Sequence, residues 1–211
     1  MKAFIFDMDG VLIDSEPLHI EVKLETFRHF GIPFPPEKLP SFAGRTSKDL
    51  FTEALLAHPQ AGLTWQELAS FKHQRYIDRL IHDPSIQPIT GVTELLRRLR
   101  SKKFRIGLAS SSGRNIIEMV LSRFGIRSYF DTIVSGAELP HSKPYPDIYL
   151  KAAEGLGIPP CDCTVVEDAT AGIAAAKAAG MTCIAFHNPH SGQQDLSQAD
   201  RIVEHFSEIL V

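Results

Sequence analysis

The chain has 211 residues and a net charge of -3, and 44% of its residues are hydrophobic and 22% charged. This balance, with a mean hydropathy of -0.05, is typical of a soluble globular protein, either one domain or a core with a smaller insertion. No block of like charge occurs. The sequence therefore argues against nucleic acid and against a membrane surface as partners.

Three cysteines, Cys161, Cys163 and Cys183, are too few and too irregularly spaced for a disulfide framework, and we expect small buried thiols. No basic leader followed by an apolar segment opens the chain, and no apolar run reaches the roughly 18 residues of a membrane helix. No exposed apolar stripe stands out either. We therefore expect a cytoplasmic protein and a monomer.

The first predicted element is a wholly apolar strand over Ala3–Phe6, and a long interval without a convincing strand follows it. Segments rich in proline and glycine divide this interval, which has helical patterns at Leu18–Phe30, Ser47–Leu56 and Trp65–Ile81. A connection of this length predicts a domain of its own. We expect a helical cap domain at 16–84, inserted into a core formed by 1–15 and 85–211.

Beyond the cap, short apolar runs alternate with helical patterns. Runs without polar alternation are typical of strands covered on both faces, as in a parallel sheet. The sequence therefore predicts an α/β fold class, with a doubly wound, Rossmann-like core and an inserted all-helical cap. The predicted strands are Phe104–Ala109, Thr132–Ser135, Thr164–Val166, Thr182–Phe186 and Arg201–Val203, and the predicted helices are Val92–Arg100, Asn115–Phe124, Asp147–Leu156 and Ala169–Ala179.

Polar segments follow four of the predicted strands, at the sheet edge where ligands of open parallel sheets gather. Each segment alone has a simpler explanation, such as a helix cap or a solvated lysine. Their joint occurrence predicts one functional site. The four segments are Asp7-x-Asp9-Gly10, Ser110-Ser111-Ser112-Gly113, His141-Ser142-Lys143-Pro144 and Glu167-Asp168.

These side chains suit the chemistry of a phosphate monoester. Asp7 can attack phosphorus, while Asp9 can protonate the departing oxygen and later take a proton from water. Asp7 and Asp168 can hold a hard cation such as Mg²⁺. Ser110 can receive the phosphate oxygens, and Lys143 can offset the charge that develops in the transition state.

The same motifs, in the same order, resemble those of the haloacid dehalogenase-like superfamily. The resemblance covers essentially the whole chain, and Asp7-Met8-Asp9-Gly10-Val11 is its most specific part. It implies that Asp7 is the nucleophile and that Asp9 is the general acid and base. It also implies an Mg²⁺ cofactor held by Asp7, by the main-chain carbonyl of Asp9 and by Asp168, with Glu167 bound through water or orienting its neighbours.

The inserted helices resemble the cap of β-phosphoglucomutase and of small sugar-phosphate phosphatases. In that group, His19 and Lys72 match positions that serve the substrate, and Ser111 is expected beside Ser110 at the phosphate. A mutase cap places an arginine where Ser47 stands here, with Arg45 two residues before that position and Lys48 one residue after it. This weaker grip on a second phosphate favours hydrolysis.

The leading hypothesis is therefore a magnesium-dependent phosphatase acting on a small phosphorylated metabolite, such as a sugar phosphate. The alternative is a β-phosphoglucomutase. A receiver-type signalling module also has an acidic metal site and a phosphorylated aspartate, but it has no cap, and its aspartate ends a middle strand of the chain.

Overall fold

The computed structural model describes residues 2–42, 46–59 and 62–210 of the chain. The chain forms two compact units. The core unit consists of Met1–Asp14 and Pro84–Val211, and the helical unit is the continuous segment Ser15–Asp83.

A sheet of six parallel strands forms the centre of the core unit, as the sequence predicted. The strand order is β3-β2-β1-β4-β5-β6, so the first strand of the chain lies in the middle of the sheet. Its four residues are all buried, and Ala3 pairs with Arg105 on one side and with Cys163 on the other. The strands are β1 (Ala3–Phe6), β2 (Arg105–Ser110), β3 (Thr132–Ser135), β4 (Cys163–Glu167), β5 (Thr182–Phe186) and β6 (Arg201–Val203).

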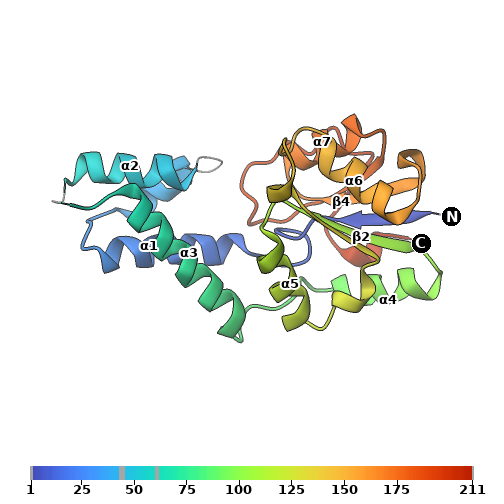
Figure 1. Cartoon of the computed structure of the whole chain (residues 1–211), viewed down its shortest axis with the longest axis horizontal. Helices are drawn as coiled ribbons and strands as arrows, with labels where there is room; N and C mark the ends of the chain where they lie inside the picture. The colour runs from blue at the N-terminus through green and yellow to red at the C-terminus, as the bar shows by residue number, and fades with distance from the viewer. Residues whose placement is uncertain (1, 43–45, 60–61, 211) are drawn as a thin grey trace. The chain divides into compact units, whose positions relative to one another are not determined.

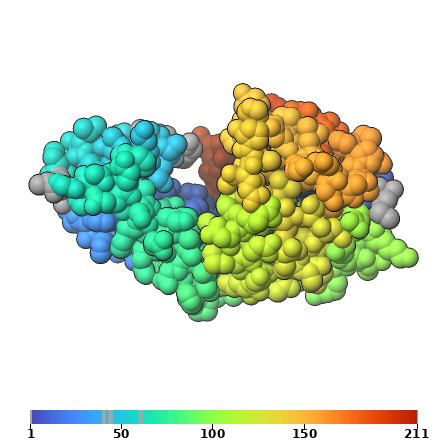
Figure 2. Space-filling view, in the orientation of Figure 1, coloured from blue at the N-terminus to red at the C-terminus, as the bar shows by residue number. Residues whose placement is uncertain are grey.

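Helices cover both faces of this sheet, with α6 and α7 on one face and α4 and α5 on the other (Figure 1). In the space-filling view the blue of the N-terminal strand is almost hidden by later segments of the same unit (Figure 2). The buried residues of α6 and α7 form one apolar cluster with residues of β1 to β5, in which α6 packs against β1, β2 and β3 and α7 against β4 and β5. The four helices are α4 (Val92–Ser101), α5 (Arg114–Arg123), α6 (Asp147–Leu156) and α7 (Thr170–Ala178).

The helical unit consists of α1 (Glu16–His29), a 3₁₀ helix at Pro36–Phe42, α2 (Ser47–Ala57) and α3 (Trp65–His82). Helices α2 and α3 each begin with a capping box. The hydroxyl of Thr46 or Thr64 accepts a hydrogen bond from the main-chain N–H of the third residue of the helix, and the carboxylate of that third residue accepts one from the main-chain N–H of the threonine. An apolar cluster that includes Phe27, Phe51 and Leu68 forms the core of this unit.

A few sequence predictions were wrong in detail. The segment 31–36 was expected to separate two helices, and α1 does end before it, at His29, but the 3₁₀ helix at Pro36–Phe42 was not predicted. Helix α7 begins at Thr170 and ends at Ala178, one residue inside the expected limits at each end. Cys163 and Cys183 are buried as expected, whereas Cys161 is exposed because it lies in the turn before β4.

Among the described residues, every helix is too short or too polar to cross a lipid bilayer.

Candidate active site

Asp7 lies directly after β1, the middle strand, and is buried with only 7% of its surface exposed. The main-chain N–H of Asp7 donates to the carbonyl of Val166 in β4 at 3.0 Å, which continues the parallel pairing by one residue. This bond fixes the backbone at the point where the chain leaves the sheet. The Asp7 carboxylate is thereby held at the carboxyl edge, between the ends of β2 and β4.

The Lys143 ammonium joins two of the predicted acidic residues. Its Nζ donates to Asp7 Oδ1 at 2.7 Å and to Glu167 Oε1 at 2.6 Å, and the Lys143 side chain is only 10% exposed. Burial lowers the pKa of Lys143, but the two carboxylates outweigh this effect and hold that pKa above its usual value. Lys143 is therefore a permanent positive charge beside Asp7.

Glu167 is completely buried and accepts hydrogen bonds at both of its carboxylate oxygens. Oε1 accepts from the Lys143 ammonium and, at 2.8 Å, from the Tyr149 hydroxyl. Oε2 accepts from the main-chain N–H groups of Asp168 and Ala169, at 2.8 and 2.9 Å. Burial raises the pKa of Glu167, but Lys143 and these hydrogen bonds lower it below the usual value. Glu167 is thus ionised and saturated with protein donors.

The Glu167 side chain occupies the space that a side chain at position 172 would need. A Cβ at Gly172, in α7, would lie 1.7 Å from Glu167 Oε1. We expect Gly172→Ala to destabilise the protein by about 2 kcal/mol or more, because Glu167 must give up hydrogen bonds to make room. Urea unfolding measures this change.

The sign of that change is decisive, because helix propensity alone favours alanine over glycine by about 0.5–1 kcal/mol. Ala171→Gly, at an exposed position of the same helix, serves as the control and is expected to cost no more than about 1 kcal/mol. A stabilised Gly172→Ala protein would contradict the role of this glycine.

Asp7, Glu167 and Asp168 form a group that could hold a metal ion. One oxygen from each residue lies within 4.8 Å of the other two. Burial raises the pKa of Asp7 well above its usual value, with Lys143 opposing this shift and the neighbouring carboxylates adding to it. Burial and Glu167 raise the pKa of Asp168 to about 7. Crowded, buried carboxylates of this kind fit a hard divalent cation, which favours their charged forms.

Asp9 is half-buried and lies within reach of the serine segment that follows β2. The Ser112 hydroxyl donates to Asp9 Oδ2 at 3.0 Å, and the Ser112 N–H donates to the Ser110 hydroxyl oxygen at 3.1 Å. Ser110 is completely buried, whereas Ser111 is exposed. The structure therefore brings the segments that carry Asp9 and Ser110 together, through Ser112.

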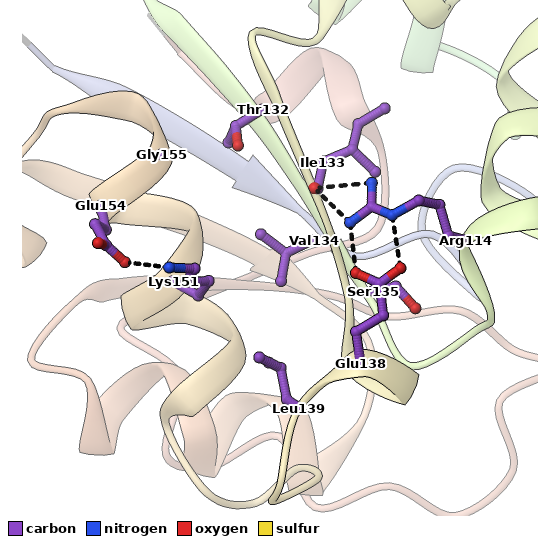
Figure 3. A pocket seen from close by; sticks show the side chains of 10 residues that line it. All are labelled: Arg114, Thr132, Ile133, Val134, Ser135, Glu138, Leu139, Lys151, Glu154 and Gly155. Carbon is purple, nitrogen blue, oxygen red and sulfur yellow. Dashed lines mark hydrogen bonds and ion pairs between the residues drawn. The ribbon is translucent and has the colours of Figure 1, made fainter.

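An ion pair connects the serine segment to the loop that leads to Lys143. Arg114, the first residue of α5, donates to both oxygens of Glu138, with Nε to Oε1 at 2.6 Å and Nη2 to Oε2 at 2.7 Å (Figure 3). Its guanidinium also donates to the Ile133 carbonyl of edge strand β3 at 3.4 Å. These three residues line a cavity of about 410 Å³ beside β3, and the lining of this cavity includes none of Asp7, Asp9, Glu167 and Asp168.

The helical unit contains the other predicted substrate residues. Lys72 Nζ lies 3.0 Å from His19 Nδ1, and the His19 ring stacks on Tyr76 with centroids 4.2 Å apart. Burial, followed by the charge of Lys72, lowers the pKa of His19 to about 3, so His19 is neutral and accepts this hydrogen bond.

The predicted residues for a second phosphate lie near the start of α2. Ser47 is the first residue of α2, and Lys48 Nζ lies 5.6 Å from the centroid of the Trp65 ring. Arg45 lies outside the described residues.

The sequence did not single out four polar residues that bind the predicted ones. Each of them donates a side-chain hydrogen bond: Ser112 to Asp9, Tyr149 to Glu167, Asn188 to the Gly10 carbonyl and Ser191 to Asp168. Ser112 was visible within the serine run that follows β2. The other three stand in segments without a recognisable motif.

Known proteins resemble this chain over most of its length. Residues 4–186 match the family model described as haloacid dehalogenase-like hydrolase. Hexitol phosphatase B of Escherichia coli K12 is 34% identical over 190 residues, which cover 90% of this chain and 85% of that protein. β-Phosphoglucomutase of Bacillus subtilis is 33% identical over 214 residues, covering 99% of this chain and 92% of the relative.

A solved structure shares the fold over almost the whole chain. The crystal structure of CbbY from Rhodobacter sphaeroides in complex with phosphate aligns with a TM-score of 0.81 and 26% identity. The alignment covers 99% of this chain and 96% of CbbY. These findings confirm the resemblance on which the sequence prediction rested. The chain belongs to the haloacid dehalogenase-like hydrolases, in a group whose members include sugar-phosphate phosphatases and a β-phosphoglucomutase.

Proposed function

We propose that the protein is a magnesium-dependent phosphatase that hydrolyses small phosphorylated sugars or related phosphate monoesters through an aspartyl-phosphate intermediate. The observation that carries the proposal is the position of Lys143, whose ammonium lies 2.7 Å from Asp7 in a buried cluster of carboxylates. A permanent cation beside a carboxylate at the end of a central strand suits attack on a dianionic phosphoryl group. The fold and the relatives support the same chemistry.

In the first half-reaction, a carboxylate oxygen of Asp7 forms a bond to phosphorus as the bond between phosphorus and the ester oxygen breaks. Asp9 gives its proton to the departing alcohol. Ser110 and the N–H groups that begin α5 receive the phosphoryl oxygens, with Ser111 beside them. Lys143 offsets the negative charge that accumulates on those oxygens.

In the second half-reaction, water attacks the phosphorus of the aspartyl phosphate and Asp9 takes a proton from that water. The bond between phosphorus and the Asp7 oxygen breaks, which releases inorganic phosphate and restores the carboxylate. The Ser112 hydroxyl, 3.0 Å from Asp9 Oδ2, orients the Asp9 carboxyl group through both steps.

Asp7, Asp168 and the main-chain carbonyl of Asp9 would hold Mg²⁺, which supplies positive charge next to the phosphoryl oxygens. Glu167 suits a supporting role, because four protein donors already occupy its oxygens. It holds the Lys143 ammonium in place, and it raises the pKa of Asp168 in the absence of a cation.

The helical unit would supply the contacts that choose the substrate. His19 and Lys72 already form a pair, so the Lys72 ammonium can donate to a substrate oxygen while His19 holds it. Ser47 and Arg45 complete the expected set. The proposal takes the substrate to be a small metabolite and the protein to be a cytoplasmic monomer that binds neither nucleic acid nor membrane.

A second candidate function is that of a β-phosphoglucomutase, which interconverts β-glucose 1-phosphate and glucose 6-phosphate. The relative from Bacillus subtilis supports it, because the similarity covers 99% of this chain. The serine at position 47 argues against it, since Ser47 lacks the positive charge with which an arginine would hold a second phosphate.

The experiment is a panel of phosphorylated sugars, sugar alcohols and nucleotides, each assayed for inorganic phosphate and for isomers. With Mg²⁺ we expect phosphate release from at least one phosphorylated sugar or sugar alcohol. Removal of the metal with EDTA should abolish the release, and added Mg²⁺ should restore it. Isomer formation from β-glucose 1-phosphate with a trace of the 1,6-bisphosphate, and without free phosphate, would contradict hydrolysis and establish the mutase.

A further inference from the structure

The segment that follows β5, residues 187–194, makes polar contacts with two loops that carry acidic residues of the site. Its Asn188 is only 5% exposed, and all of the contacts described below lie within the core unit. A buried amide side chain is costly unless its donors and its acceptor are satisfied. The partners of Asn188 therefore show what this residue holds in place.

Both polar atoms of the Asn188 side chain form hydrogen bonds. Nδ2 donates to the Gly10 carbonyl at 3.1 Å and to Asp14 Oδ1 at 3.3 Å. Oδ1 accepts from the His190 N–H at 2.9 Å, which closes a local turn. One end of this side chain thus shapes its own segment, and the other binds a loop 178 residues earlier in the sequence.

The loop that Asn188 binds is the one that contains Asp9. Gly10 follows Asp9 and adopts a φ of +77°, and its N–H donates to the Ile13 carbonyl at 2.8 Å. The peptide plane between Asp9 and Gly10 is therefore fixed on one side, and Asn188 fixes the next plane through the Gly10 carbonyl. Together the two bonds determine where the Asp9 carbonyl and side chain point.

Other residues of the segment strengthen the same connections. His190 Nδ1 binds Asp14 Oδ2, which ties the far end of the Asp9 loop to the segment. The Ser191 hydroxyl donates to Asp168 Oδ2. Gly10 also lies against Asp168, because a Cβ added at Gly10 would be 2.0 Å from Asp168 Oδ2. The loop that contains Asp9, the loop that contains Asp168 and the segment 187–194 therefore pack directly against one another.

We propose that Asn188 is a positioning residue of the active site, which holds the Gly10 carbonyl and Asp14 and thereby fixes the loop that presents Asp9. This inference rests on the proposed function, because the loop matters for catalysis only if Asp9 and its carbonyl serve the reaction and the metal. Asn188 touches neither substrate nor reacting atoms in this assignment; it acts through the loop.

The test compares Asn188→Asp and Asn188→Ala with the wild-type protein. Asn188→Asp keeps the acceptor for the His190 N–H but places an oxygen where Nδ2 donates to Gly10 and Asp14, so it repels both. We expect both variants to lower kcat on p-nitrophenyl phosphate with Mg²⁺ by about tenfold, with KM within about twofold. We also expect a dissociation constant for Mg²⁺, measured by calorimetry without substrate, that is about tenfold weaker.

Asp200→Ala is the matched control. Asp200 accepts from the Cys183 N–H at 2.7 Å, near the start of β5, and so supports the same strand at its opposite end. It is expected to lower Tm and to leave kcat and the Mg²⁺ affinity unchanged. If Asn188→Asp behaved like wild type, or if Asp200→Ala lost as much activity, the positioning role would be overturned.

The outcomes also separate this inference from the proposed function. If the wild-type protein binds Mg²⁺ without hydrolysing any ester, and Asn188→Asp weakens that binding, the positioning role stands and the phosphatase proposal fails. If hydrolysis occurs and the Asn188 variants match wild type in kcat and in Mg²⁺ affinity, the positioning role alone fails. A wild-type protein that neither binds Mg²⁺ nor turns over would overturn both.

Discussion

Asp7→Asn is expected to lower phosphate release by about 10⁴-fold or more, because the amide cannot form the acyl phosphate. The substitution keeps the shape of the side chain in a residue that is only 7% exposed, so packing around it is preserved. The measurement is kcat for inorganic phosphate release from the best substrate of the panel. Intact-mass spectrometry of acid-quenched turnover should detect a phosphoryl group on the wild-type protein and none on the variant.

This loss should occur without a loss of stability. The folded-state pKa of Asp7 is raised, so the folded protein binds more protons than the unfolded chain above about pH 4, and the ionised carboxylate lowers stability as the pH rises. Asparagine removes that cost, and Tm at pH 7 should be equal to or above that of wild type. Asp162→Asn, in the turn before β4, is the control and should retain full activity. Undiminished turnover by Asp7→Asn would refute the proposed nucleophile.

Lys143→Met is expected to have the second largest effect, on both activity and stability. It leaves Asp7 and Glu167 buried without the ammonium that lies 2.7 and 2.6 Å from their oxygens. Removing one partner of a buried ion pair costs about 3–5 kcal/mol, and losing a charge aimed at the transition state lowers kcat by about 10²–10³-fold. Thermal unfolding and steady-state kinetics measure the two losses.

The cost of Lys143→Met to stability should depend on pH. Lys143 lowers the pKa of both carboxyl groups, so its removal raises the folded-state pKa of Asp7 further and lets that of Glu167, which burial raises, rise above its unfolded value. The folded variant then binds more protons than the unfolded chain, and its stability falls as the pH rises above about 4. The Tm difference from wild type should therefore be larger at pH 8 than at pH 5.

The exposed Lys151, which pairs with Glu154 on α6, supplies the control. Lys151→Met should change Tm little, because exposed ion pairs contribute at most about 1 kcal/mol. An equal Tm difference for Lys143→Met at both pH values would mean that the buried carboxylates are not what the lysine stabilises.

The sequence was sufficient for the strands and for the order of the site segments, because both depend on local pattern. An uninterrupted apolar run predicts a strand with two covered faces, and the expected limits of Ala3–Phe6 and Thr182–Phe186 agree with the structure. Parallel pairing then places Asp7 and Asp168 at one edge, since both follow neighbouring strands. That step needs only the direction of the strands.

The supporting contacts could not be predicted, because they depend on side-chain directions across long separations. Tyr149 looks like one more apolar residue of α6, and only the packing of that helix on the sheet, against β1, β2 and β3, brings its hydroxyl to Glu167. Asn188 stands in a turn-like segment of asparagine and proline, where a hydrogen bond within the turn is the simplest expectation. Its bond to Gly10 becomes visible only when β5 and β1 have their places in the sheet.

The central place of β1 has a consequence for biosynthesis. The ribosome makes this strand before both of its partners, which begin at Arg105 and Cys163, so the apolar segment stays unpaired in the nascent chain until those strands have been made. The helical unit, continuous from Ser15 to Asp83, can build its own interior meanwhile. Closing the sheet late, over such separations, makes this a slow step of folding. Until the sheet closes, β1 exposes apolar surface and unpaired main-chain groups, which makes it the segment to which we expect a chaperone to bind.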